Sequence, residues 1–208
     1  MINPGTLEIT SGTPQVRSVF FNTRQPIQTF MVSFRLQAVS LNPISTPQGV
    51  CLINQNNAAG AGAVGLGNGG LGFAGMQNAR ALAIYAVDTT RVAWGVAPGT
   101  TTGAAQLASN RPLDVTMNYV GTQLSVTIDD PALPGVEYIG QFEVGSLSTQ
   151  LGNSQAFIGF SASTGTATNL GGATFHISDI AYSAVPAPGA VALGAACLIA
   201  ARRRRDSM

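Results

Sequence analysis

AFIGFSASTG occupies residues 156–165, and a glycine-rich break separates it from ATFHISDIAYS at residues 173–183. Aromatic and β-branched residues stand close together in both runs, a pattern that predicts two buried strands. Phe157 and Phe160 fall on opposite faces of the first strand, because side chains alternate with a period of two. Neither face is then solvated, so this strand is predicted to lie in the core of a sandwich.

The same alternation predicts further strands along the chain. In residues 30–38, FMVSFRLQA, the apolar side chains fall mostly on one face, as in a half-buried antiparallel strand. Residues 113–119 and 123–129 alternate around Gly121, which predicts a hairpin. The other strand candidates are residues 16–21 and 49–55.

The composition is typical of a single-domain β protein. The 208 residues are enough for one sandwich with a sizeable core. Only 9% of them are charged and 25 are glycine, which indicates a surface solvated mainly by neutral polar groups. A nucleic-acid-binding domain needs a basic stripe, so we expect no nucleic-acid partner.

The cysteines, the histidine and the tryptophan are interpreted as structural. Cys51 lies in a predicted strand and Cys197 in a C-terminal apolar segment, so no disulfide is expected. His176 has no Cys, Asp or Glu at metal-ligand spacing, which favours a structural or surface role. Trp94, in RVAWGV, is predicted to be a core residue rather than a platform for stacking a sugar ring.

Four stretches of the chain resemble the legume-type (L-type) lectin domain, in that family's order. They are SVFFNTRQPIQTFMVSFRL (18–36), PQGVCLINQNN (47–57), LGNGGLGFAGMQNARALAIYAVDTT (66–90) and GFSASTG (159–165). The resemblance implies an all-β, two-sheet antiparallel jelly-roll sandwich of the concanavalin A-like type over residues 5–184. The domains of this family usually begin with an additional strand before the first of these stretches, and none is predicted here.

The resemblance also implies a carbohydrate-binding groove. Its candidate residues are Gln48, Gly69, Gly70, Asp88, Gly165 and Thr166. Gln48 stands where the family has an Asp that accepts hydrogen bonds from two sugar hydroxyls, whereas an amide accepts and donates. The glycine-rich loop offers a backbone donor that a ligand can approach closely. Without the resemblance, residues 56–75 are interpreted as a flexible, low-complexity loop.

We expect no metal, no cofactor and no enzymatic activity. Alignment of Asp88 with the family's metal-binding Asp puts Ala86 where a Glu is needed, and residues 89–103, TTRVAWGVAPGTTTG, contain no Asp, Asn or His. Hard cations require several oxygen ligands. Glycosidases built on related sandwiches carry carboxylates at alternate positions of one strand, but Glu137 and Glu143 are six positions apart.

The C-terminal segment, residues 185–208, resembles the PEP-CTERM sorting tail of Gram-negative bacteria. Pro186 and Pro188 flank Ala187, where that family usually has Glu, and the apolar residues 189–201 follow. Four arginines come next, namely Arg202, Arg203, Arg204 and Arg205. The resemblance implies a short apolar helix, transiently anchored in the inner membrane and removed by an exosortase-type protease. An ordinary C-terminal helix with a basic end is the alternative.

Export requires an N-terminal signal, and MINPGTLEIT has no basic region followed by an apolar one. We therefore expect this start to be internal to a longer reading frame.

Two functions remain open for an exported bacterial surface or extracellular-matrix protein. One is a metal-independent carbohydrate-binding domain with a glycan or exopolysaccharide partner, and the other is a structural surface or biofilm-matrix protein that keeps the fold without binding sugar.

Overall fold

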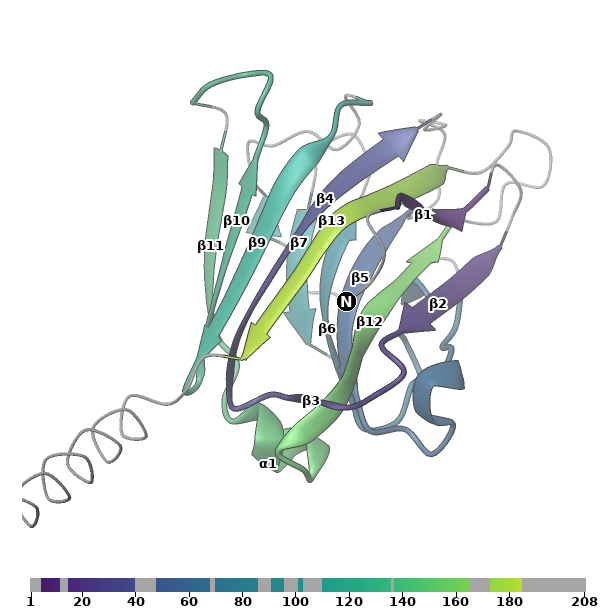
Figure 1. Ribbon diagram of the computed structural model, residues 1–208, viewed down its shortest axis with the longest axis vertical. Coiled ribbons are helices and arrows are strands. Elements are labelled where there is room, and N and C mark those ends of the chain that lie inside the picture. The colour runs from purple at the N-terminus through teal and green to yellow at the C-terminus, as the bar shows by residue number, and fades with distance from the viewer. Residues whose placement is uncertain are drawn as a thin grey trace, which may run out of the picture.

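A computed structural model describes residues 5–11, 15–39, 48–67, 70–85, 91–95, 101–102, 110–135, 137–164 and 173–184. Within these ranges the chain forms two antiparallel sheets that pack face to face (Figure 1). The six-stranded sheet has the order β1 (Leu7–Thr10), β13 (Thr174–Ala184), β4 (Thr29–Val39), β9 (Leu113–Val120), β10 (Gln123–Asp129) and β11 (Glu137–Glu143).

The second sheet faces it across the main core. Its order is β2 (Val16–Phe20), β12 (Gln155–Ser163), β5 (Gly49–Gln55), β6 (Ala79–Tyr85), β7 (Arg91–Gly95) and β8 (Thr101–Thr102), with β3 (Gln25–Pro26) also paired to β12. We call it the seven-stranded sheet, a count that covers the described residues. The predicted all-β, two-sheet antiparallel sandwich is confirmed.

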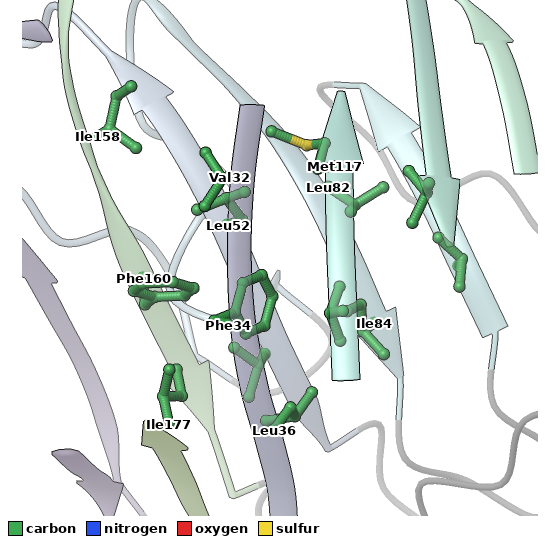
Figure 2. Close-up of a cluster of buried hydrophobic side chains, with 14 of the residues drawn as sticks. Val32, Phe34, Leu36, Leu52, Leu82, Ile84, Met117, Ile158, Phe160 and Ile177 are labelled. Carbon is green, nitrogen blue, oxygen red and sulfur yellow. The ribbon is translucent and has the colours of Figure 1, made fainter. Parts of the chain in front are cut away.

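Strict alternation builds the six-stranded sheet, because one of its faces is buried and the other meets solvent. Phe30, Val32, Phe34 and Leu36 of β4 are all buried in the main core. Figure 2 shows Val32, Phe34 and Leu36 among the other side chains of this core. The rings of Phe34 and Phe160 meet edge to face with their centroids 4.9 Å apart, which joins the two sheets at the centre of the core. The half-buried strand predicted at residues 30–38 is confirmed.

The central strands of the seven-stranded sheet, β12, β5 and β6, are buried on both faces. All seven residues of β5 are buried: Val50 and Leu52 face the main core, and Cys51 and Ile53 face a second apolar cluster on the outer side of the sheet. In β12, Phe160 belongs to the main core and Phe157 packs against the second cluster. The predicted burial of both faces of this strand is therefore confirmed.

The hairpin of β9 and β10 is also confirmed. Val120 pairs with Gln123, and Gly121 turns the chain with a φ of 66°, a conformation that glycine adopts without strain. Trp94 lies in β7 and packs against the main core, as predicted.

A strand was not predicted before residue 16, and this expectation was wrong. β1 pairs antiparallel with β13, with Leu7 opposite Ile177, and Ile9 is buried in the main core. A four-residue strand carries too little alternation to be recognised in the sequence, and its partner lies at the other end of the chain.

The short helix α1 (Leu147–Leu151) was also missed. Ser146 caps it by accepting a hydrogen bond from the Thr149 amide, and Gly152 ends it in the left-handed conformation. Leu147 and Leu151 are buried and close one end of the sandwich (Figure 1). A five-residue helix is too short for its apolar residues to show a helical repeat in the sequence.

The predicted C-terminal segment lies outside the described residues. This applies to Pro186, Pro188, Arg202, Arg203, Arg204 and Arg205, and to the apolar helix expected between them. In the described part of the chain, no helix has the length and apolar character needed to span a bilayer.

Cys51 should be chemically inert in the native protein. Burial raises the pKa of its thiol to about 12, so almost no thiolate, the reactive form, exists near neutral pH. In a Cys197→Ser background, we expect an aromatic disulfide reagent at pH 8 to label Cys51 only as fast as the chain unfolds globally. Rapid labelling in native buffer would contradict this burial, and complete labelling in denaturant is the control.

Candidate functional site

Strand registers bring several candidate positions to one end of the seven-stranded sheet. Gly49, the first residue of β5, pairs with Ser163 of β12 on one side and with Tyr85 of β6 on the other. Gln48 therefore lies between the point where the chain leaves β12 and the point where it leaves β6. Residues separated by more than 100 positions in the sequence meet at this end, toward which β12 runs in Figure 1.

Gln48 is 1% exposed, so its side chain is buried behind the surface at this end of the sheet. Gly69, Asp88, Gly165 and Thr166 lie outside the described residues. Their places in the groove remain predictions, although the described neighbours Gly70, Tyr85 and Thr164 flank the positions concerned.

Two hydrogen bonds fix the exit of β12 just before Gly165. The Gln15 amide donates to Thr164 Oγ1 at 2.8 Å, and the Thr164 amide donates to the Gln15 carbonyl at 3.2 Å. Thr164 is 1% exposed. The chain therefore leaves β12 from a position that is fixed at Thr164.

The described parts of the glycine-rich segment, residues 60–67 and 70–76, form an ordered structure. Backbone hydrogen bonds link Gly65 to Gly72 at 2.8 Å and Leu66 to Ala74 at 2.8 Å, and the Gly72 amide donates to the Leu66 carbonyl at 2.8 Å. Interpretation of this stretch as a flexible loop was wrong, because its Leu71, Phe73 and Met76 side chains form the second apolar cluster with the sheet. We call residues 60–67 and 70–76 the glycine-rich lobe.

The lobe is seated directly on β12 and β2. A Cβ atom on Gly72 would lie 2.9 Å from Val16 Cγ2 and 3.0 Å from Ser161 Cβ, so only glycine fits this contact. Gly72 also has a φ of 76°, and the preceding Leu71 has a φ of 49° although it is not glycine. Strained backbone of this kind persists where the surroundings fix it, and it occurs often at binding sites.

Two serines of the seven-stranded sheet donate hydrogen bonds to backbone carbonyls of the lobe. Ser161 Oγ donates to the Leu71 carbonyl at 2.7 Å within the buried contact, and Ser18 Oγ donates to the Ala63 carbonyl at 2.5 Å. The sequence analysis did not identify these two residues as site supports. In the sequence, Ser161 is recognisable only as a polar residue on the same strand face as Phe157. Its role becomes clear only in the structure, which shows the Leu71 carbonyl that it contacts.

Replacement of Ser161 by Ala should loosen the lobe. The change leaves the buried Leu71 carbonyl without its donor, which costs about 1–3 kcal/mol of unfolding free energy. Urea denaturation would measure the loss. Ser125→Ala is the matched control, because the Ser125 hydroxyl makes only a 3.4 Å contact on the opposite sheet. Equal losses in the two variants would contradict a special role for Ser161.

The described side chains of β5, β6 and β12 at this end are uncharged. They are Gln48, Ser161, Ser163, Thr164 and Tyr85, and the exposed Arg17 of β2 lies opposite Ala162 beside them. Burial raises the pKa of the Tyr85 hydroxyl, which therefore stays neutral. A site of this kind suits a neutral ligand that offers hydroxyl groups.

His176, the other residue considered as a ligand, lies in β13 of the six-stranded sheet, not in the sheet that carries Gln48. Its Nε2 atom is 3.5 Å from a Glu8 carboxylate oxygen across the pairing of β1 and β13, on a partly exposed face. The structural or surface role predicted for it is confirmed. Among the described residues, no three His, Cys, Asp or Glu side chains are grouped so that they could hold a metal ion.

Comparison with solved structures identifies proteins that share this fold. No protein-family model matches the chain, and no curated protein matches it. Several solved legume lectins share its architecture over most of their length. Arcelin-5, a lectin-like defense protein from Phaseolus vulgaris, has a TM-score of 0.72 at 13% identity and covers 88% of this chain and 87% of its own.

Two more legume lectins were solved with ligands. The basic winged bean lectin with Tn-antigen has a TM-score of 0.68 at 17% identity, over 88% of this chain and 87% of its own. The lectin from Bauhinia forficata in complex with GalNAc has a TM-score of 0.65 at 14% identity, over 88% and 93%. The fold is thus the concanavalin A-like sandwich of the legume lectins, as the sequence resemblance implied.

The metal pair that the resemblance associates with this fold does not suit the residues present. Tyr85 ends β6, and between it and residue 103 the sequence supplies one carboxylate, that of Asp88. One carboxylate cannot provide the several oxygen ligands of a hard cation.

Proposed function

We propose that this chain is a carbohydrate-binding domain that works without a metal ion. The observation that carries the proposal is the glycine-rich lobe, fixed by the hydrogen bond from Ser161 to Leu71 beside the point where β12 ends. A rigid lobe presents backbone groups to a ligand at little entropic cost. The resemblance to legume-type lectins implies a metal that orders the binding loop, whereas here the second apolar cluster packs the lobe against the sheet.

Neutral hydrogen-bonding groups are the chemistry of this site. Sugar hydroxyls donate and accept, and so do amides, hydroxyls and the backbone near Gly70. The fold neighbours were solved with Tn-antigen and with GalNAc, which supports a glycan as the class of ligand. We further propose that the domain has no catalytic activity and that it is an exported bacterial protein of the cell surface or extracellular matrix.

Export would depend on the C-terminal segment and on an exosortase-type protease. Pro186, Pro188 and the four arginines from Arg202 to Arg205 are the sequence features that support this. The membrane would then be a transient partner through the apolar residues 189–201.

A second candidate function is a structural surface or matrix protein that keeps the fold without binding sugar. The burial of Gln48 favours it, because a groove with an exposed Gln48 at its floor would have favoured direct contact with sugar. The two functions differ in one measurable property, which is glycan binding by the folded protein.

A glycan-array screen of the full chain, in EDTA and again in calcium, tests the proposal. We expect binding that survives EDTA. In Gln48→Ala, which removes a buried amide from behind the groove, binding should weaken about tenfold. Gln123→Ala, on the exposed face of the other sheet, is the control and should bind like the unchanged protein.

Three outcomes would contradict it. No binding by a chain that unfolds cooperatively would favour the structural function. Binding lost in EDTA would exclude metal independence, and equal loss in Gln48→Ala and Gln123→Ala would remove Gln48 from the site.

A further inference from the structure

Two asparagines lie on one face of β5, at the end of the sandwich that α1 closes (Figure 1). Asn54 is two positions from Leu52 and shares its face, which is turned to the main core. Asn56 follows the strand, and its backbone amide donates to the Asn78 carbonyl at 2.8 Å, which continues the pairing with β6. The side chains of Asn54 and Asn56 therefore lie on the same face.

Asn54 is a fully buried polar residue, with an exposure of 0%. Among the described residues, neither its Oδ1 nor its Nδ2 atom has a hydrogen-bond partner. An amide that leaves water without gaining hydrogen bonds costs a large part of the stability of an ordinary domain. Such a group in a stable fold indicates that a further molecule supplies its hydrogen bonds.

The strands on either side of Asn54 offer it no side-chain partner. In register, Asn54 lies opposite Ile158 of β12 and Arg80 of β6. Ile158 is apolar. Arg80 directs its Nε atom to Gln150 Oε1 of α1, and its Nη1 atom donates to the Ala79 carbonyl at 2.7 Å.

Asn56 is satisfied on one side of its amide only. Its Nδ2 atom donates to the Leu151 carbonyl at 3.2 Å and to the Gln155 carbonyl at 2.9 Å. These two acceptors identify the nitrogen of the amide, so the other atom is the oxygen. Asn56 Oδ1 is buried and has no donor within the described ranges. The two asparagines together leave two acceptors and one donor group unpaired.

The spacing of the two amides suits a single small bridging molecule. Alternate residues of an antiparallel strand have Cα atoms about 6.8 Å apart. A molecule that makes hydrogen bonds of about 2.8 Å to both side chains joins atoms up to about 5.6 Å apart. Two amides that extend from one face of a strand come within this distance.

The donor and acceptor pattern selects water over an ion. A hard cation needs several oxygen ligands, and the neighbouring Arg80 guanidinium would repel it. An anion could accept from Asn54 Nδ2, but it would face the oxygens of both amides. Water donates to Asn54 Oδ1 and Asn56 Oδ1 and accepts from Asn54 Nδ2, which gives the three hydrogen bonds that a buried water typically makes.

We propose that Asn54 and Asn56 bind one buried water molecule at the end of the main core that α1 closes. The water links the last core-facing positions of β5 and satisfies the amides that no described side chain reaches. This inference is independent of the proposed glycan function, because Gln48 lies before the opposite end of the same strand.

Urea denaturation of Asn54→Leu in the full chain tests the proposal through the sign of its effect. Leucine has nearly the shape of asparagine but no polar atom, so it displaces the water and leaves Asn56 Oδ1 without a donor. The unfolding equilibrium constant should rise at least about tenfold, because three hydrogen bonds are lost. Asn118→Leu, on the solvent-facing side of β9, is the matched control and should change that constant by less than about threefold.

Nuclear magnetic resonance detects the water directly. The side-chain NH₂ signal of Asn54 is identified by its loss in Asn54→Leu. In the unchanged protein it should show cross-peaks to water of opposite sign in NOESY and ROESY spectra, which mark a long-lived bound water. The Asn118 NH₂ group, which is in contact with exchanging surface water, should show no such pair of peaks.

Three results would overturn the proposal. An unfolding constant that falls in Asn54→Leu would mean that the buried amide is unpaired in solution. Absence of the water cross-peaks at the Asn54 NH₂ group would exclude a bound water. Stability of the unchanged protein that falls when gluconate replaces chloride at equal ionic strength would identify an anion as the occupant.

Discussion

Replacement of Gly159 by Ala is expected to prevent the domain from folding stably, with a loss of more than about 4 kcal/mol in unfolding free energy. A Cβ atom at this position would overlap the Val19 carbonyl oxygen and lie 2.6 Å from Phe20 Cα. Both atoms belong to the backbone of β2, which pairs with β12 in register at this point. No side-chain rotation can relieve the overlap, so the two strands must separate.

Soluble yield and urea denaturation would measure this effect. Gly62→Ala is the matched control, because a Cβ there meets no atom within 4 Å, and its stability should change by less than about 0.5 kcal/mol. A Gly159→Ala variant as stable as Gly62→Ala would mean that β2 does not approach β12 as closely as the structure shows.

The second large effect is expected from Phe160→Ala. Phe160 is 3% exposed between the sheets and contacts the Phe34 ring, so truncation removes apolar contacts and leaves a cavity. The cost should be about 3–5 kcal/mol, measured by denaturation in urea.

Phe157→Ala provides an internal comparison for this prediction. Phe157 is three positions away on the same strand, only partly buried, and has the Arg24 guanidinium 5.3 Å from its ring centroid. Its truncation should cost clearly less than that of Phe160. An equal or larger loss at Phe157 would contradict the view that the core between the sheets dominates stability.

Long, regular strands could be predicted from the sequence alone. The alternation in residues 30–38 gave β4 to within one residue at each end, and residues 49–55 coincide with β5. These strands are long enough for a pattern to be recognised, because successive side chains face the core and solvent in turn, or two apolar layers. β1, β3 and α1 were not predicted, because two to five residues carry no measurable period and these elements depend on partners far away in the chain.

The candidate site was predictable in outline only. The GFSASTG and glycine-rich stretches were predicted to lie near one another from their resemblance to a known family, and the structure brings Ser161 of the first against Leu71 of the second. The sequence could not show that Ser161 holds the Leu71 carbonyl across 90 positions, nor that Leu71, Phe73 and Met76 give the glycine-rich lobe a core of its own. Nor could it show the burial of Gln48, because burial depends on which strands lie beside β5 in the folded chain.

The central strands of the seven-stranded sheet, buried on both faces, have a consequence for engineering new binding specificity. Randomised libraries at Leu71, Phe73 or Met76 would alter the second apolar cluster and, through β5, the layer that also supports the main core. Most members of such a library should be lost to misfolding before selection acts on binding. Val64, Leu66 and Gln77 are exposed within or next to the same lobe, so diversification confined to these positions should preserve a folded population.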